Sequence, residues 1–231
     1  MRRLFLFLLV FLMLFLLLSQ LFFPRVVALA LEEAVRYNFP HAADVQVEVE
    51  AVPATKILLG KFDVINLYIT EGSVGGLPVS RFQSRLKEVQ IDWGELLQEK
   101  KLVLRYQQPS FTEIVLLASD VSRYLEQQLR GRFLKPEVRL GDDQVTLLGS
   151  VSIFSMPVEL EIDGTLEISG AREIAFKPRN LRINRVELGN PFRENILAQT
   201  RFLISLEQIP FVSELEKIEV GQGKLIIKAR S

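Results

Sequence analysis

The longest apolar stretch of the chain lies at its N-terminus, where the residues from Leu4 to Phe23 include only two polar side chains, Ser19 and Gln20. At about 1.5 Å of rise per helical residue, a stretch of this length matches the ~30 Å hydrocarbon core of a bilayer. Arg2 and Arg3 precede it, and basic residues at this position keep the N-terminus in the cytoplasm. The pattern predicts an N-terminal transmembrane helix that places the rest of the chain outside the cell membrane.

A cleaved signal peptide is the alternative interpretation of the same stretch. The uninterrupted apolar run from Leu4 to Leu18 is at the upper end of the roughly 7 to 15 residues of a signal-peptide core, and Ala28-Leu29-Ala30 has the small-x-small pattern of a cleavage site. We favour a retained anchor, because the run is long and the cleavage pattern lies well beyond it. Residues 1–24 are therefore predicted to be the anchor and residues 25–231 one extracytoplasmic domain, which is secreted if the leader is removed.

The segment behind the leader predicts one helix followed by two strands. From Val26 to Tyr37 apolar residues recur every three to four positions, with acidic residues on the opposite side, which is typical of an amphipathic helix. This helix and the leader are compatible with one rod interrupted at Pro24. Residues Val45 to Val52 alternate between apolar and polar side chains, and Phe62 to Thr70 is rich in β-formers.

The stretch from Val79 to Trp93 fits two periods. A helical stripe joins Phe82 and Leu86 to Val89, whereas Val89 and Ile91 alternate with polar neighbours as in a strand. We favour the strand.

A short helix around Gly94 to Lys100 and two longer helices are expected in the rest of the domain. Ser119 is predicted to cap a helix that runs to Arg130, with four apolar residues on one face. A second helix is predicted from Phe192 to Ser205, because a proline near the first turn is tolerated there. The other elements are strands separated by turns, one of which is expected near Met156-Pro157. The predicted strands are Phe111–Ala118, Val138–Leu140, Val145–Phe154, Val158–Ile168, Ile174–Phe176, Leu181–Val186, Ile218–Val220 and Leu225–Ala229.

Composition and charge exclude several classes of protein. The chain has 231 residues, enough for one well-buried domain, and no cysteine, which excludes a disulfide framework, a thiolate metal site and a thiol nucleophile. Removing Arg2 and Arg3 from the 28 basic residues leaves 26 against 28 acidic residues, a net charge of −2 for the exported part. No nucleic-acid partner is predicted, since binding to a phosphate backbone needs a concentrated basic surface.

No catalytic or metal site is predicted. His41 is the only histidine, so it has no second imidazole with which to hold zinc. Asp142-Asp143 and the glycines of Gly72–Gly76 are typical of turns. Glu159 and Glu161 have period-two spacing, which places both on the polar face of a strand rather than across a glycosidic bond. The sequence therefore predicts neither an enzyme nor a cofactor.

Large apolar residues at helix faces and turns suggest a lipid site. If they rim an opening instead of closing a core, an acyl chain can insert between them, and nearby cations can meet a phosphate head group. The candidate groove residues are Val121, Tyr124, Leu125, Leu129, Phe154, Met156, Phe192 and Phe211. The candidate head-group residues are Lys177, Arg179, Arg182 and Arg185. The alternative is that the same apolar residues simply cap the core.

Short motifs along the chain also resemble those of a known family. They are Leu59-Gly60-Lys61-Phe62, Gly76-Leu77-Pro78-Val79, Val89-Gln90-Ile91-Asp92, Ala118-Ser119-Asp120-Val121 leading to Tyr124-Leu125, Val145-Thr146-Leu147-Leu148-Gly149, Leu206-Glu207-Gln208-Ile209-Pro210 and Gly223-Lys224-Leu225-Ile226-Ile227. From about Ala30 onward their order resembles the bacterial exported family called domain of unknown function 2993, which is similar to the mycobacterial lipomannan-elongation (LmeA-like) phospholipid-binding proteins. The resemblance implies a membrane-associated domain whose antiparallel strands curl around a helix, as in tubular lipid-binding folds, and which binds phospholipid. It supplies no catalytic residue.

These observations predict an α+β fold, in which a long, strongly curved antiparallel β-sheet wraps around or packs on one or two helices behind an N-terminal transmembrane helix. The predicted function is phospholipid binding at the membrane, with acyl chains in an apolar groove, in support of cell-envelope lipid or glycolipid assembly. The alternative is a non-catalytic structural or interaction module of the envelope with a closed core. An esterase or glycosidase is a third interpretation, which no catalytic motif supports.

Overall fold

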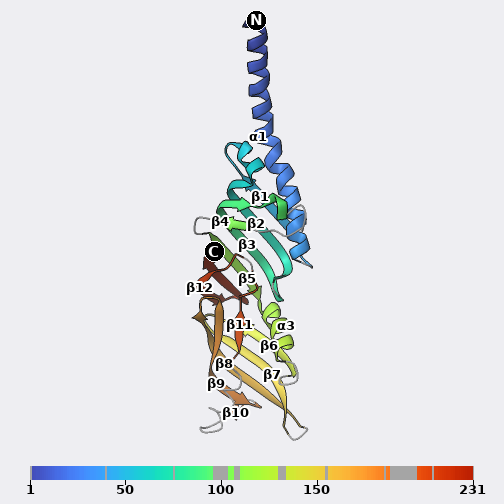
Figure 1. Cartoon of the computed structure of the whole chain (residues 1–231). Coiled ribbons are helices and arrows are strands. Elements are labelled where there is room, and N and C mark those ends of the chain that lie inside the picture. The colour runs from blue at the N-terminus through green and yellow to red at the C-terminus, as the bar shows by residue number, and fades with distance from the viewer. Residues whose placement is uncertain are drawn as a thin grey trace. The chain divides into compact units, whose positions relative to one another are not determined.

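The fold is mostly antiparallel β-sheet, with a sheet that curls into a half-barrel and a few helices (Figure 1). The computed structural model describes residues 2–39, 41–74, 76–95, 104–106, 110–129, 134–153, 156–184, 186–187, 202–209 and 211–230. The chain divides into two compact units. Unit 1 comprises Met1–Ile69 and Gln83–Ser110, and unit 2 comprises Thr70–Phe82 and Phe111–Ser231.

Unit 1 begins with one long helix, α1 (Arg2–Asn38), which continues through Pro24. The C-terminal part of α1 is the predicted amphipathic helix. Its buried residues Leu31 and Val35 lie in the core, and α1 packs on strand β1 (Asp44–Glu50). The carboxylate of Glu32 accepts a hydrogen bond of 3.1 Å from the backbone N–H of Val47. The helix therefore serves as one wall of the unit.

The predicted N-terminal transmembrane helix is not supported by the described residues. None of the helices in the part of the chain that the structure describes is long and apolar enough to cross a membrane. The helix itself is present, since α1 contains the whole stretch from Leu4 to Phe23 and runs across the predicted boundary after residue 24. The domain boundary stays a prediction.

The remainder of unit 1 is a sheet with the strand order β1-β2-β3, in which β4 pairs with β3. These strands are β2 (Lys61–Val74), β3 (Leu77–Ile91) and β4 (Leu104–Tyr106). The C-terminal end of β2 and the N-terminal end of β3, within Thr70–Phe82, belong to unit 2. A short 3-10 helix, η1 (Ala54–Leu59), connects β1 to β2 and was not expected from the sequence.

The stretch from Val79 to Trp93, which fits both a helical and a strand period, lies mostly in the strand β3, as we predicted. Its buried residues alternate at Leu77 and Val79, again at Phe82, Ser84 and Leu86, and again at Val89 and Ile91. The alternation therefore slips by one residue twice, and Glu88 next to the second slip has a positive φ of 51°. Such irregularities are typical of β-bulges, and they gave the sequence its apparent helical spacing.

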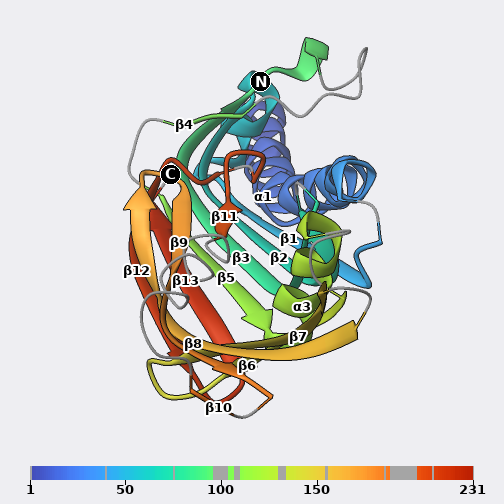
Figure 2. The same ribbon diagram turned by 90° about the horizontal axis from the view of Figure 1, so that it is seen from below.

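In its described residues, unit 2 contains two sheets and one helix (Figure 2). In the first, β5 (Phe111–Leu117) pairs with β13 (Lys224–Arg230), which pairs with β12 (Glu214–Gly221). The second has the order β10-β9-β8-β7-β6, and β11 also pairs with β9. Its strands are β6 (Leu134–Leu140), β7 (Val145–Ile153), β8 (Met156–Gly170), β9 (Glu173–Ile183), β10 (Val186–Glu187) and β11 (Leu203–Ser205). Helix α3 (Ala118–Gln128) packs on β6 and β5.

Two local predictions for unit 2 are wrong, and one turn is displaced slightly. Met156 and Pro157 already belong to β8, because Met156 pairs with Ile153 and Pro157 with Ser152 in the β7–β8 ladder, so the turn predicted near them comes just before Met156. The two short strands expected between Ile174 and Val186 are mainly one strand, β9. Residues 203–205 of the predicted helix Phe192–Ser205 form β11, because they pair with β9 and bury Ile204; residues 192–201 lie outside the described residues.

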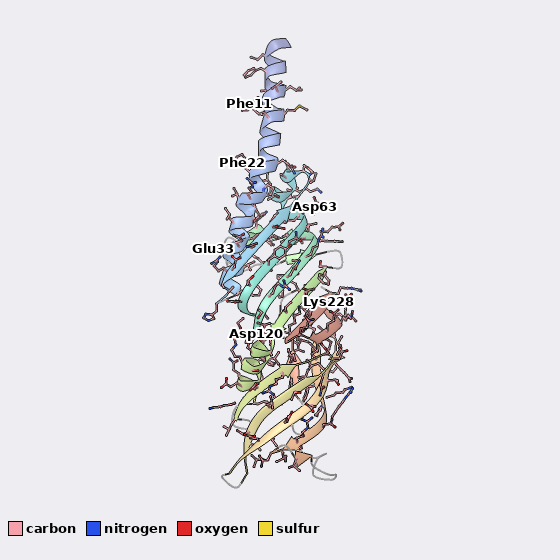
Figure 3. All side chains as sticks on the ribbon, turned by 180° about the vertical axis from the view of Figure 1, so that it is seen from behind. Phe11, Phe22, Glu33, Asp63, Asp120 and Lys228 are labelled. Atoms are coloured by element: carbon pink, nitrogen blue, oxygen red, sulfur yellow. The ribbon has the colours of Figure 1, made fainter. Side chains whose placement is uncertain are left out.

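The start of α3 also differs from the prediction, since the helix begins at Ala118 and Ser119 is not its cap. The cap is the carboxylate of Asp120, which is buried and accepts a hydrogen bond of 2.8 Å from the backbone N–H of Leu117 (Figure 3). The same carboxylate accepts bonds of 2.6 Å from the Ser80 hydroxyl and from the guanidinium of Arg123. Asp120 therefore ties α3 to the preceding strand and to β3.

We expect Asp120→Ala to lower the free energy of unfolding by about 3 kcal/mol, because it removes the buried acceptor that the Leu117 N–H, the Ser80 hydroxyl and Arg123 share. Arg123→Ala is the matched control, since it removes only the mostly exposed partner of the ion pair and should cost less than about 1 kcal/mol. Chemical denaturation followed by circular dichroism measures both. Equal losses in the two variants would show that the exposed ion pair, and not the buried network, is what stabilises the helix start.

Candidate functional site

A pocket of about 520 Å³ lies in unit 2, where β11 and the residue before it run beside β9. Its lining residues are Ala175, Phe176, Lys177, Pro178, Phe202 and Leu203. All of them except Lys177 are apolar. The volume is within the ~300–1,000 Å³ that is usual for sites of small molecules.

Two stacked rings form the apolar wall of the pocket. The rings of Phe176 and Phe202 have centroids 4.8 Å apart and planes that differ by 14°. Both residues are buried, and the backbone N–H of Phe176 donates to the carbonyl of Phe202 at 3.0 Å. Leu203 is different, because 52% of its surface is exposed. The pocket thus has a wall of two stacked aromatic rings and a leucine that is in contact with solvent.

The position of Phe176 depends on a glycine in the neighbouring strand. A Cβ atom at Gly164 would lie 2.6 Å from the Phe176 ring and 2.4 Å from the carbonyl oxygen of Lys177. The β8–β9 register shifts between Asp163 and Gly164, so this bare backbone stands at an irregularity of the ladder. The ring of Phe176 covers the glycine in the way that aromatic residues pack over glycines in sheets.

The polar edge of the pocket is an ion pair across β8 and β9. The ammonium group of Lys177 donates to the carboxylate of Glu167. This hydrogen bond is the main cause that lowers the pKa of Glu167 below its ordinary value of 4.5, and the charge of Arg179 acts in the same direction. Near neutral pH the carboxylate is therefore ionised and holds Lys177. An anionic ligand at this edge has to compete with Glu167.

Arg182 is engaged in a structural network. Its guanidinium donates to Glu161 at 2.8 Å and to Asp163 at 2.9 Å. Asp163 is buried and also accepts a bond of 2.8 Å from the hydroxyl of Thr146. The network links β7, β8 and β9, and removal of one partner leaves buried charge behind.

The predicted groove residues do not gather at this pocket. Val121, Tyr124 and Leu125 are buried on α3, and Leu129, at the end of that helix, is half-buried. Phe211 is half-buried, and its carbonyl accepts a bond of 2.9 Å from the Thr112 hydroxyl. None of these five lines the pocket.

Among the predicted site residues whose side chains the structure describes, Lys177 alone lines the pocket. Arg179 is exposed on β9 two residues further on. The backbone of Met156 lies in β8, and its side chain is outside the described part, as are Phe154, Arg185 and Phe192.

Two aromatic residues of the pocket were missed from the sequence. Phe176 was expected only as part of a strand, and Phe202 was assigned to a helix. The sequence did contain a signal, because Phe202, Ile204 and Leu206 are apolar at every second position. In the structure these three are buried, whereas Leu203 and Ser205 between them are exposed.

One family model matches the chain. It is described as LmeA-like phospholipid-binding and matches residues 19–230, which include every residue that lines the pocket. No curated protein and no solved structure gives a significant match to the chain.

We expect Gly164→Ala to lower the free energy of unfolding by about 1 to 3 kcal/mol, because the new methyl group has to displace the Phe176 ring and backbone atoms. Gly170→Ala on the same strand is the control, since its Cβ would approach only the Glu173 side chain, at 3.4 Å or more, and its effect should stay within about 0.5 kcal/mol. Urea titration of both variants provides the comparison. Similar stabilities would contradict the role given to Gly164.

The lowered pKa of Glu167 leads to a pH prediction. The ion pair with Lys177 contributes its full stabilisation above the ordinary value of 4.5 and loses it as the pH falls through the lower folded value. We expect the carboxyl ¹³C resonance of Glu167 to titrate below pH 4.5, and Lys177→Met to raise that midpoint toward 4.5. Lys135→Met is the control and should leave it unchanged. An unshifted midpoint in Lys177→Met would mean that the pair does not form in solution.

Proposed function

Because the chain belongs to the LmeA-like phospholipid-binding family, we propose that it binds a phospholipid without chemical conversion and holds an acyl chain in the pocket beside β9 and β11. The observation that carries the proposal is the wall made by the stacked rings of Phe176 and Phe202. Such a surface suits a hydrocarbon chain, because each Å² of apolar surface removed from water contributes about 25 cal/mol. The pocket needs no reactive group for this role.

The head group is proposed to lie at the edge that carries Lys177, with Arg179 near it along β9. Lysine binds phosphate as a point charge, whereas arginine can offer two parallel donors. A phosphate that arrives here would replace Glu167 as the partner of Lys177. Arg182 is not needed as a ligand, since it is already paired with Glu161 and Asp163.

The N-terminal part of α1 is proposed to keep the protein at the cell membrane, with the N-terminus in the cytoplasm and the other elements outside. Large apolar side chains are exposed along this part of the helix, and a helix that is apolar around its circumference is suited to a lipid environment. In this position the protein would serve cell-envelope lipid or glycolipid assembly. Cleavage near Ala30 would instead release a secreted form that meets membranes through its own surface.

A structural or interaction module of the envelope is the second candidate. It is favoured by the burial of Val121 and Leu125, which pack α3 as ordinary core residues. Under this alternative the pocket beside β9 would stay empty of lipid.

A photoactivatable phospholipid with its reactive group in the acyl chain tests the proposal. The full chain is reconstituted in vesicles that contain this lipid, irradiated and digested, and the modified peptides are identified by mass spectrometry. We expect adducts on the peptides that contain Phe176 and Phe202. Adducts confined to α1, or none at all, would contradict acyl-chain binding in the pocket.

Two leucine variants make the same experiment specific. Leu203→Asp places a carboxylate in the pocket at an exposed position and should reduce the adducts on these peptides about tenfold or more. Leu134→Asp is the control, because Leu134 is exposed to the same extent, 52%, and does not line the pocket. Equal labelling of the two variants would favour the interaction module.

A further inference from the structure

Three large apolar side chains of unit 1 are exposed in one short segment, which we call the η1 segment (Ala51–Gly60). Val52 has 69% of its surface exposed, Leu58 has 63% and Leu59 has 69%. Figure 1 shows this segment beside α1, at the end of unit 1 from which the N-terminal part of the helix projects. Burial of Ala54 and Ile57 on the inner side of the segment already supplies its contribution to the core. The exposed residues are therefore not explained by the packing of unit 1.

The side chain of Gln20 fixes the position of the η1 segment along α1. Its amide nitrogen donates to the carbonyl of Ala51 at 3.0 Å, and its amide oxygen accepts from the N–H of Ala54 at 2.8 Å. Gln20 lies near the end of the apolar stretch, three residues before Phe23. The η1 segment is thus held beside the helix at the point where the apolar stretch gives way to the amphipathic part that packs on β1.

The segment is held rigidly with its leucines outward. The carboxylate of Asp63 accepts the N–H of Val52 at 2.6 Å and pairs with the ammonium group of Lys56 at 2.8 Å. The hydrogen bond from Lys56 is the main cause that lowers the pKa of Asp63, and the bond from Val52 acts in the same direction. The carboxylate is therefore ionised near neutral pH. The indole N–H of Trp93 donates to the carbonyl of Ile57 at 3.0 Å.

A glycine closes the segment. Gly60 has a φ of 69°, and a Cβ there would lie 2.2 Å from the carbonyl oxygen of Ile91. The carbonyl of Gly60 accepts the N–H of Ile91 at 2.8 Å. The exposure of Leu58 and Leu59 therefore belongs to a fixed conformation and not to a loosely attached loop.

The part of α1 before Gln20 indicates what covers these leucines. Leu4, Phe7, Leu8 and Phe11 are all mostly exposed, although they are among the most apolar residues of the chain, and Figure 3 shows Phe11 on a part of the helix with no other element beside it. From Leu4 to Gln20 the helix rises about 24 Å, close to the depth of a bilayer's hydrocarbon core. If this part lies in lipid, the η1 segment stands at the boundary between hydrocarbon and head groups.

The chemistry around the segment fits that boundary. Tryptophan is enriched at membrane interfaces, and Trp93 lies against the segment. Lysine side chains can lay their stems along apolar surface and keep the charge in water, and Lys56 and Lys61 are in or next to the segment. A surface for a protein partner would not need to lie beside the end of the apolar part of α1, whereas a membrane contact does.

We propose that Val52, Leu58 and Leu59 form a second membrane contact, which inserts into the interfacial layer of the same bilayer that receives the N-terminal part of α1. This inference rests on the membrane attachment proposed above and is independent of the pocket beside β9. Two contacts at a fixed separation would restrict the tilt and rotation of unit 1 on the membrane.

The chain has no cysteine, so single labels can be placed without other changes. Leu58→Cys carries an environment-sensitive fluorophore, and the full chain is reconstituted in vesicles of phosphatidylcholine and phosphatidylglycerol. We expect a blue-shifted emission that lipids brominated near the head group quench at least about twofold. Arg36→Cys is the control, because it is exposed on the same helix about 24 Å beyond Gln20 and should not be quenched.

Each other outcome overturns the proposal in a distinguishable way. If the chain floats with the vesicles and the label at residue 58 behaves like that at residue 36, the second contact does not form. A blue shift without quenching by brominated lipid would place Leu58 against protein. In either case, photolabelling of Phe176 and Phe202 in the same vesicles would leave phospholipid binding intact. Failure of the chain to float would overturn both membrane contacts.

Discussion

The contact between the bare backbone of Gly164 and the ring of Phe176 is the constraint on which the pocket depends. A side chain at residue 164 would occupy the space of the ring and approach the carbonyl of Lys177. Because Phe176 is held there, Phe202 can stack on it, and β11 can pair along β9. The same β8–β9 ladder places Glu167 within reach of Lys177 and Arg182 within reach of Glu161 and Asp163. The glycine thus makes room for the apolar wall, and the register of the same ladder places the charged edge beside it.

The strands were largely predictable from the sequence, because alternation of apolar and polar residues directly reflects which face of a sheet is buried. β1, β2, β7, β8 and β13 follow that pattern, whereas β5 was predicted from the continuous apolar run Ile114–Leu117. The errors arose where a contact with residues outside the local pattern determined the secondary structure. Residues 203–205 form a strand because β9 offers them a partner far away in sequence. The start of α3 is set by the buried carboxylate of Asp120 and not by the hydroxyl of Ser119.

The pocket could not be predicted from sequence patterns for a related reason. Phe176 and Phe202 meet only through the pairing of strands that are distant along the chain, and no local signal specifies that pairing. Lys177 and Arg182 were recognised as cations, but their acidic partners depend on the register of β8 against β9, which a sequence alone does not state. The family resemblance, in contrast, was visible in short motifs, and the family match over residues 19–230 confirms it.

Trp93 gives the η1 segment a further property. It is the only tryptophan of the chain, its indole N–H donates to the carbonyl of Ile57, and its ring lies edge-on to Phe62 at a centroid distance of 6.1 Å. Indole emission responds to hydrogen bonding and to polarity, so the tryptophan fluorescence of the unlabelled protein reports on this segment. The chain therefore carries its own optical sensor at the surface where we expect it to meet the bilayer.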